Sequence, residues 1–429
     1  LDHVQHDYGV PTSEGAQITQ SQSRYSLEHL SKSPWQGVEA LRISLSGGNY
    51  AHDENDVAGV VQTRWKSQSI GGKAELSFGS DGVVKGKTGI QLSTGELSAI
   101  EASSGQAAIV PKTQSNSQAL YLIGESKANT LKLLWGARYE YATQNPDKQA
   151  VYAGGNPGFN GGSYVPGNLN NRHFGLFAYS AVLDWKVARE YGASLGYTRS
   201  ERAPNPVELY GFGPHDSTAT FIVGNSNLTA ETSDHYEFKL YKHIGLLQGK
   251  TIIYLSRFHN YIYGFNTGNF SVNNGNYSVT TTSQAPARIK GAEAEVTYLF
   301  SNTNLLTRIF GEVSKGEFES GGYLPLQPAP RIGLELQYQL TQLTTKLTYL
   351  HAYAQNRLAS FELGKTPAYD LLNLNISYQE KMLGSVLTTY LRAGNLLNRD
   401  VRYSTTPETV RLYAPQMGRS VLLGIKASF

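Results

Sequence analysis

The sequence has no cysteine among its 429 residues. Without thiols the chain can form neither disulfides nor thiolate metal sites, so histidine and carboxylate side chains are the best candidate metal ligands. The sequence also lacks an apolar run of about 18 residues, the length that a membrane-spanning helix needs. Only 40% of the residues are hydrophobic and the mean hydropathy is -0.35, both of which are low for a large globular core.

The charges of the chain are almost balanced, with 37 basic and 34 acidic residues and a formal net charge of +3. This balance gives no support to nucleic acid as a partner, since nucleic-acid-binding proteins carry clustered positive charge. The sequence contains neither a His-Glu-x-x-His zinc motif nor a phosphate-binding P-loop. We therefore predict that the protein is not an enzyme and holds no catalytic cofactor.

Apolar and polar residues alternate with a period of two in many short segments. A strand has this pattern when one face meets lipid and the other meets a polar lumen, although a two-sheet sandwich would produce it too. The last segment ends in Phe429, which is typical of outer-membrane β-barrels, and the 28 tyrosines suit aromatic girdles at the membrane surfaces. These features favour an all-β, antiparallel transmembrane barrel. The clearest alternating segments are 130–141, 177–185, 294–300, 332–340, 372–378 and 421–429.

Short turns alternate with long polar stretches along the chain. Outer-membrane barrels have this plan, with short turns on the periplasmic side and long loops outside. Nine long stretches predict about eighteen antiparallel strands. The nine stretches are 9–24, 47–66, 94–117, 143–172, 201–233, 260–287, 314–330, 354–366 and 399–417.

Four motifs in the second half resemble one family. They are Glu201-Arg202-Ala203-Pro204-Asn205-Pro206-Val207-Glu208-Leu209-Tyr210, Gly224-Asn225-Ser226-Asn227-Leu228, Ile289-Lys290-Gly291-Ala292-Glu293-Ala294-Glu295 and Asn395-Leu396-Leu397-Asn398-Arg399. As a set they resemble the barrel of TonB-dependent outer-membrane receptors. The resemblance implies a barrel of about 22 strands with a plug domain inside. It also implies energy coupling through the inner-membrane TonB–ExbB–ExbD complex, by way of the plug.

A narrower resemblance is to the zinc-uptake receptors of this family, and it runs from about Asp7 to Phe429. It rests on Phe212-Gly213-Pro214-His215, on Tyr50-Ala51-His52-Asp53-Glu54 and on two segments at 353–359 and 415–420. It implies import of zinc or a zinc complex across the outer membrane. Nothing in the sequence resembles a plug or a signal peptide. We therefore interpret residues 1–429 as a barrel domain that is incomplete at its N-terminus, with about 18 of the 22 strands and no plug.

Two groups of residues are candidate metal ligands. His52, Asp53 and Glu54 lie together in a predicted external loop, where imidazole and carboxylates suit Zn²⁺ and would equally suit a solvated loop tip. Glu208, His215 and Asp216 lie in the family-like connection, where the resemblance implies that ligands face the lumen. Glu208 belongs to a motif general to the family, so a structural role is its alternative.

Other functions remain open from the sequence. A haem or siderophore receptor of the same family is one, and Tyr210 with His215 would suit haem, which takes an axial histidine or tyrosine. A passive porin-like or adhesive barrel is another. In each case the expected partner is the lipid of the outer membrane, which the chain would cross many times.

Overall fold

The computed structural model describes residues 2–11, 15–79, 83–154, 157–273, 276–382 and 384–428, so the terminal Phe429 lies outside the described residues. Twenty strands form a single sheet. Their bounds are β1 Asp2–Gly9, β2 Gln17–Trp35, β3 Val38–Asn55, β4 Val61–Phe78, β5 Val84–Glu101, β6 Ala107–Ala128, β7 Leu131–Pro146, β8 Arg172–Lys186, β9 Tyr191–Arg202, β10 Phe212–His215, β11 Thr220–Val223, β12 Glu231–Lys242, β13 Leu247–Phe270, β14 Ser278–Phe300, β15 Leu305–Phe318, β16 Arg331–Gln339, β17 Leu343–Ala352, β18 Tyr369–Met382, β19 Ser385–Gly394 and β20 Ser420–Ser428.

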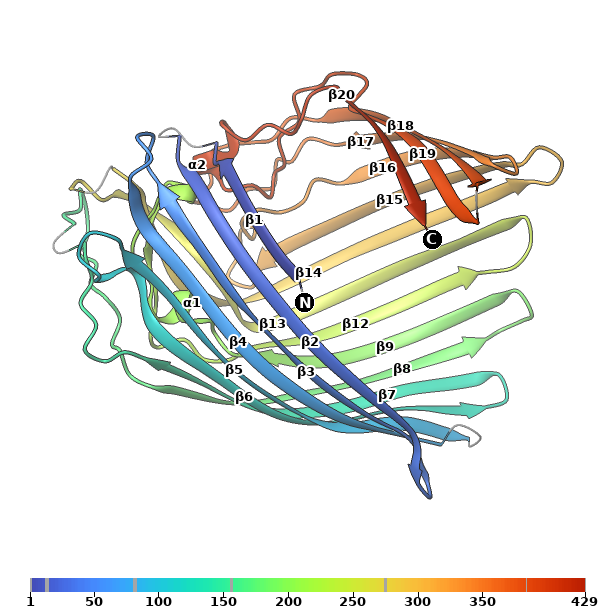
Figure 1. Cartoon of the computed structure of the whole chain (residues 1–429), viewed down its shortest axis with the longest axis horizontal. Coiled ribbons are helices and arrows are strands. Elements are labelled where there is room, and N and C mark those ends of the chain that lie inside the picture. Colours follow the sequence, from blue (N-terminus) through green and yellow to red (C-terminus); the bar gives the residue numbers. More distant parts are fainter. Residues whose placement is uncertain are drawn as a thin grey trace.

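The strands form an up-and-down array in which each long strand pairs antiparallel with the next along the chain. The four-residue strands β10 and β11 lie inside the connection between β9 and β12, which pair directly with each other. Without these two, eighteen strands remain, as predicted. In the described residues β1 pairs only with β2 and β20 only with β19. Figure 1 shows the strands curving around a hollow, with β1 and β20 at the two edges of the sheet.

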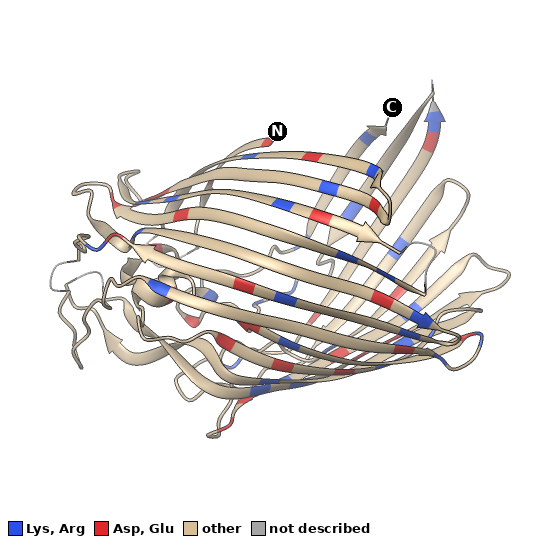
Figure 2. Ribbon diagram, turned by 90° about the horizontal axis from the view of Figure 1, so that it is seen from below, with Lys and Arg blue, Asp and Glu red and all other residues tan. Residues whose placement is uncertain are grey.

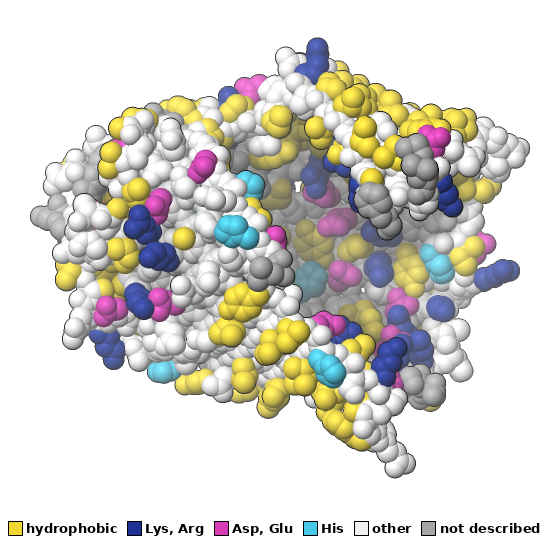
Figure 3. All heavy atoms as spheres, in the orientation of Figure 1, with side chains coloured by type: hydrophobic (Ala, Val, Ile, Leu, Met, Phe, Trp, Pro, Cys, Tyr) yellow, Lys and Arg dark blue, Asp and Glu magenta, His cyan; other side chains and the backbone are white. Residues whose placement is uncertain are grey.

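The two faces of the sheet differ in polarity, as the period of two requires. Large apolar side chains such as Leu45, Ile70 and Leu120 stand exposed on the outer wall. The inner wall carries charges, for example Glu75 with Lys73 and Lys87 at 3.2 and 2.9 Å. Acidic and basic residues are spread along the strands (Figure 2), and the hollow interior displays charged side chains (Figure 3). This is the amphipathic wall of a barrel that crosses lipid.

Four of the nine predicted long loops are wrong, because strands continue through most of them. β3 and β4 are joined by 56–60 alone, β5 and β6 by 102–106, β13 and β14 by 271–277, and β1 and β2 by 10–16. Outside the bilayer the outer face of a strand no longer meets lipid, and the inner face can be covered by loops that fold into the barrel, as Ala99 and Val110 are. A polar sequence there no longer distinguishes a paired strand from a loop, although the backbone hydrogen bonds continue. We call the end of the barrel with the long connections its outer end.

The helical segments are short. They are α1 Pro206–Tyr210, the 3₁₀ turn η1 Asp216–Thr218 and α2 Glu408–Arg411. In the described ranges no helix has the length and apolar character to cross a membrane.

Candidate metal site on the inner wall

The connection between β9 and β12 folds into the barrel at its outer end. It begins with α1, whose first turn is closed by a capping box. Asn205 accepts a hydrogen bond from the Glu208 amide, and the Glu208 carboxylate accepts one from the Asn205 amide. Pro206 at the first helical position suits this start, because its missing N–H would have no partner there. The capping box fixes the start of α1, and only one residue separates the end of α1 from β10.

β10 then packs closely against the inner wall of β6. At Gly213 a Cβ atom would lie 1.7 Å from the carbonyl oxygen of Ala108, so only glycine permits this approach. Around the contact, Val207 and Ile222 pack on a buried cluster of Ala99, Ala108, Ile109 and Val110. This packing brings His215, the last residue of β10, to the wall formed by β3 and β4.

His52 and Glu54 project from the inner face of β3. Because side chains alternate along a strand, they share one face and Asp53 lies on the other. The Nε2 atoms of His52 and His215 lie 3.8 and 3.5 Å from Oε1 of Glu54. The structure therefore brings together members of both predicted ligand groups, which are far apart in the sequence. We call His52, Glu54 and His215 the inner cluster.

Glu54 is the centre of the inner cluster and is buried, with 1% of its surface exposed. Neither carboxylate oxygen has a hydrogen-bond partner among the described residues, and the same holds for Nδ1 of His52. Burial by itself would raise the pKa of Glu54. The neighbouring His215 and His52 outweigh this effect and lower the pKa to about 2. The group is therefore a buried carboxylate that stays ionised, and the cationic groups within 4.0 Å of it in the described residues are two imidazoles.

The ring of His215 is oriented by hydroxyl groups. Its Nδ1 lies 2.8 Å from Thr218 Oγ1 and its Nε2 lies 2.8 Å from Ser217 Oγ. When Nδ1–H donates to Thr218, the lone pair of Nε2 accepts a hydrogen bond from the Ser217 hydroxyl. Hydrogen bonds of this kind fix the tautomer and orientation of metal-binding histidines.

Trp65 on β4 completes the cluster and was not foreseen from the sequence. Its ring stacks on His52 at 5.8 Å between centroids and meets His215 edge-on at 5.6 Å. Tyr50, two residues before His52 on the same face, contacts the His52 ring at 5.4 Å. Trp65 lies in a segment predicted to be a loop, and only the register of β3 with β4, which pairs His52 with Trp65, reveals its place.

The other three predicted ligands are engaged elsewhere. Asp53 forms two hydrogen bonds with Arg64 at 2.8 and 3.1 Å on the opposite face of β3. Glu208 caps α1 and forms an ion pair with Arg202 at 2.9 Å. Asp216 accepts a hydrogen bond from the Tyr277 hydroxyl at 2.8 Å. Each of these three carboxylates has a structural partner in the protein.

The inner cluster is looser than a formed metal centre. Within the part of the chain that the structure describes, no three His, Asp or Glu side chains are already gathered as a metal site. Tetrahedral zinc with bonds of about 2.0–2.2 Å places neighbouring ligand atoms roughly 3.4 Å apart. The observed 3.5 and 3.8 Å are close to this value. Small side-chain movements would therefore let Glu54 and the two imidazoles share one ion.

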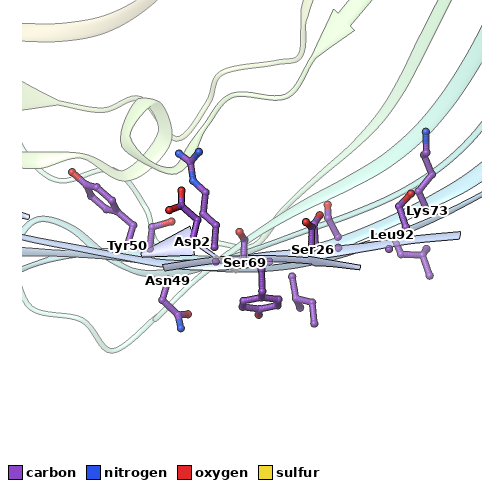
Figure 4. A pocket seen from close by; sticks show the side chains of 18 of the residues that line it. Asp2, Ser26, Asn49, Tyr50, Ser69, Lys73 and Leu92 are labelled. Atoms are coloured by element: carbon purple, nitrogen blue, oxygen red, sulfur yellow. The ribbon is translucent and has the colours of Figure 1, made fainter. Parts of the chain in front are cut away.

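Two cavities adjoin the inner cluster. One of about 770 Å³ lies against β2–β5 and includes Tyr50. In Figure 4 Asp2, Tyr50 and Lys73 point to one side of this wall and Asn49 to the other. A second cavity of about 360 Å³ is lined by His215 and by loop residues including Phe361. Of the inner cluster, His215 thus lines the second cavity, whereas Glu54 lies buried behind it.

One segment matches the letters of a hydrolase motif without its geometry. Gly192-Ala193-Ser194-Leu195-Gly196 spells Gly-x-Ser-x-Gly, but the whole segment lies within β9. In hydrolases the serine sits on a sharp turn between a strand and a helix. Ser194 is buried in the strand, so this match indicates no nucleophile.

Comparisons with known proteins agree with this architecture. Residues 4–396 match the family model described as TonB dependent receptor-like, beta-barrel. Among solved structures, the copper transporter OprC is similar with a TM-score of 0.79 and 16% identity, over 99% of this chain and 68% of that one. The FrpB iron transporter from Neisseria meningitidis (F3-3 variant) has a TM-score of 0.69 and 14% identity, over 97% of this chain and 64% of that one. The hemophore receptor HasR of Serratia marcescens (a double mutant), in complex with its hemophore HasA and heme, has a TM-score of 0.70 and 16% identity, over 99% of this chain and 68% of that one.

At these identities the solved structures show the fold alone, and the chain spans about two thirds of their length. The family model, in contrast, covers most of the chain. The chain therefore belongs to the TonB-dependent receptor family of outer-membrane β-barrels.

Proposed function

We propose that the receptor containing this chain imports zinc or a zinc complex, and that Glu54, His52 and His215 bind the metal on its way through the outer membrane. The observation that carries the proposal is the buried Glu54 carboxylate, whose oxygens have no hydrogen-bond donor among the described residues and face two imidazoles. The two imidazoles keep this buried carboxylate ionised, and its oxygens, which accept no hydrogen bond from the described residues, stay available to a bound cation. The narrower resemblance to the zinc-uptake receptor ZnuD supports the same cargo.

The ligand atoms of the inner cluster suit several divalent metals. Neutral imidazole and carboxylate suit Zn²⁺, but also Cu²⁺ and Ni²⁺, and the general affinity order favours copper. Zinc is therefore preferred here on the resemblance, and the ligand atoms support a divalent metal of this class. Uptake would require a plug domain pulled by TonB–ExbB–ExbD, as the family membership implies.

The haem alternative loses one of its two candidate ligands. Tyr210 is fully buried, and its hydroxyl donates to the Asn170 carbonyl oxygen at 2.8 Å. An axial ligand has to be free to face the iron. His215 is left as the haem candidate, and it already belongs to the inner cluster.

The test is uptake of labelled Zn²⁺ by zinc-starved cells that express the full-length receptor, with and without TonB. Glu54→Gln removes the central charge at constant size, and we expect it to abolish TonB-dependent uptake. Asp53→Asn is the matched control, because it removes a neighbouring charge on the opposite face. Equal uptake by both variants would overturn the site. Growth on haem or a siderophore with no zinc uptake in any strain would overturn the cargo and leave the receptor class intact.

A further inference from the structure

The outer wall carries a basic patch that metal import does not use. It lies on β13, β14 and β15 and consists of four cations and one carboxylate: Arg257, Arg288, Lys290, Lys315 and Glu317. Each of these five residues lies two or four positions along its strand from Ile253, Ala292 or Val313, which pair with one another across the three strands, so all of them share one face. Ile253 and Val313 are exposed apolar residues of the outer wall. The basic patch therefore faces away from the lumen and is separate from the inner cluster.

The register of the strands forces like charges together in the basic patch. Arg257 lies directly opposite Arg288 across β13 and β14, and Lys290 lies directly opposite Lys315 across β14 and β15. Like charges in directly opposed positions destabilise a sheet. Two such pairs side by side are therefore unfavourable unless an anion lies between them.

The protein neutralises only part of this charge. Glu317 contacts Lys315 at 2.5 Å and Arg288 at 3.6 Å. Among the described residues no carboxylate lies within 4.0 Å of the charged groups of Arg257 or Lys290. Asp234 is opposite Arg257 in the ladder, but its carboxylate is held by Arg199 at 3.2 Å and by His259 at 2.8 Å.

The height of the basic patch on the wall identifies the partner. Below it on β14, the outward residues run from Tyr298 through Val296 to Ala292, and on β15 they include Ile309 and Val313. A tilted strand needs about 9–11 residues to cross the hydrocarbon core, and the distance from Phe300 to Lys290 matches that length. At the same level Tyr197 and Tyr236 contact each other at 5.1 Å between ring centroids, as expected for an aromatic girdle. The patch thus lies at the headgroup level of the outer leaflet.

We infer that the basic patch binds the phosphate groups of a phosphorylated lipid in the outer leaflet. Arg257 and Lys290 supply the uncompensated charge, and the apolar wall beneath them receives the acyl chains. Guanidinium groups also bind phosphate oxygens in a bidentate manner, which an ammonium group alone does not. Bound lipid phosphate would relieve the repulsion within both opposed pairs.

The experiment uses the full-length receptor extracted from outer membranes, with bound lipid counted by native mass spectrometry. The probe is a bisphosphorylated outer-leaflet glycolipid, compared with the same lipid after removal of its phosphates. Each cation near an anionic lipid surface raises affinity about fivefold, so Arg257→Gln with Lys290→Gln should weaken binding about 25-fold. The dephosphorylated lipid should bind the wild type and the variant equally.

Two controls keep the inference falsifiable. Lys112→Gln removes an exposed outer-wall cation that is already paired with Glu96 at 3.0 Å, and it should leave lipid binding unchanged. Arg257→Lys with Lys290→Arg keeps the charge and should keep most of the binding; it also serves as the folded reference if the neutral variant does not insert. Equal lipid occupancy in wild type and neutral variant would overturn the inference. So would an equal loss in Lys112→Gln, or displacement of the lipid by inorganic phosphate alone.

Discussion

Glu54 and Glu208 are both partly or fully shielded carboxylates at the outer end of the barrel, but their surroundings differ. Glu208 closes the capping box of α1 and pairs with Arg202, so its oxygens are saturated by groups of the protein. Glu54 is more deeply buried and has two imidazoles nearby, yet it accepts no hydrogen bond from the described residues. A carboxylate with permanent donors has a structural role, whereas a buried one without donors is available to a cation.

The comparison is tested most strongly by zinc titration of the purified receptor with each carboxylate replaced by its amide. Removing a residue that only hydrogen-bonds a metal ligand already lowers metal affinity by about 10–100-fold. Glu54 is proposed as a direct ligand, so Glu54→Gln should weaken zinc binding by roughly 100-fold or more. Glu208→Gln should leave zinc affinity within about twofold. It should instead lower the unfolding free energy by up to about 1 kcal/mol through loss of the ion pair with Arg202, because glutamine at this position can still close the capping box. If the two variants lost zinc affinity equally, the distinction between them would be mistaken.

A second variant changes the position of His215 without removing a ligand. Gly213→Ala places a methyl group against the Ala108 carbonyl, which forces β10 away from β6. Such overpacking lowers the free energy of unfolding by about 1–3 kcal/mol, so we expect the thermal stability to fall. We expect zinc affinity to fall with it, because His215 moves away from Glu54. Gly9→Ala is the control, because the space around that glycine is open. Unchanged zinc affinity in Gly213→Ala would mean that β10 does not position His215.

Trp65 should report metal binding directly. Its ring contacts both His52 and His215, so zinc should change the tryptophan fluorescence of the wild type. Trp65→Phe keeps an aromatic ring, and we expect it to lose the fluorescence change while zinc affinity, measured by calorimetry, falls only a few-fold. The other three of the four tryptophans lie elsewhere and serve as an internal reference. A full signal in Trp65→Phe would place the metal away from the inner cluster.

The smallest expected effect is on the pH dependence of stability. The pKa of Glu54 is lowered from 4.5 to about 2, so its ionised form stabilises the folded state above pH 4.5. That contribution is lost as the pH falls from 4.5 through 2. The stability difference between wild type and Glu54→Gln, measured by heat unfolding in detergent, should therefore be constant from pH 7 to pH 5 and change below pH 4.5. A difference that stayed the same at pH 3 would contradict the low pKa.

The sequence predicted the barrel and its strand number well, for a physical reason. Within the bilayer each strand has one face in lipid and one in a polar lumen, so 372–378 alternates strictly and 130–141 does so with Leu134 as its one exception. Turns at the other end are short and polar, and they mark each reversal. The prediction failed where neither face meets lipid, as at 47–66, because there the polarity of a residue no longer depends on its face.

The candidate ligands were predicted only as residue types in two separate groups. Three of the six, Asp53, Asp216 and Glu208, are engaged by Arg64, Tyr277 and Arg202, none of which lies next to its partner in the sequence. Trp65 escaped notice because its place depends on strand register. The sequence lacks any signal for such pairings, since they join residues from different strands and loops.

Local sequence was enough to predict an outer-membrane barrel in which histidine and carboxylate side chains are the best candidate metal ligands. Alternation along a strand and the absence of thiols are local properties, and they are readable from one residue to the next. The tertiary structure alone decided which ligands meet. The approach of His215 to Glu54 depends on the inward fold of a distant connection, on the close contact that Gly213 allows with β6, and on the register of β3. Each of these is a long-range contact between segments whose local sequences are independent of one another.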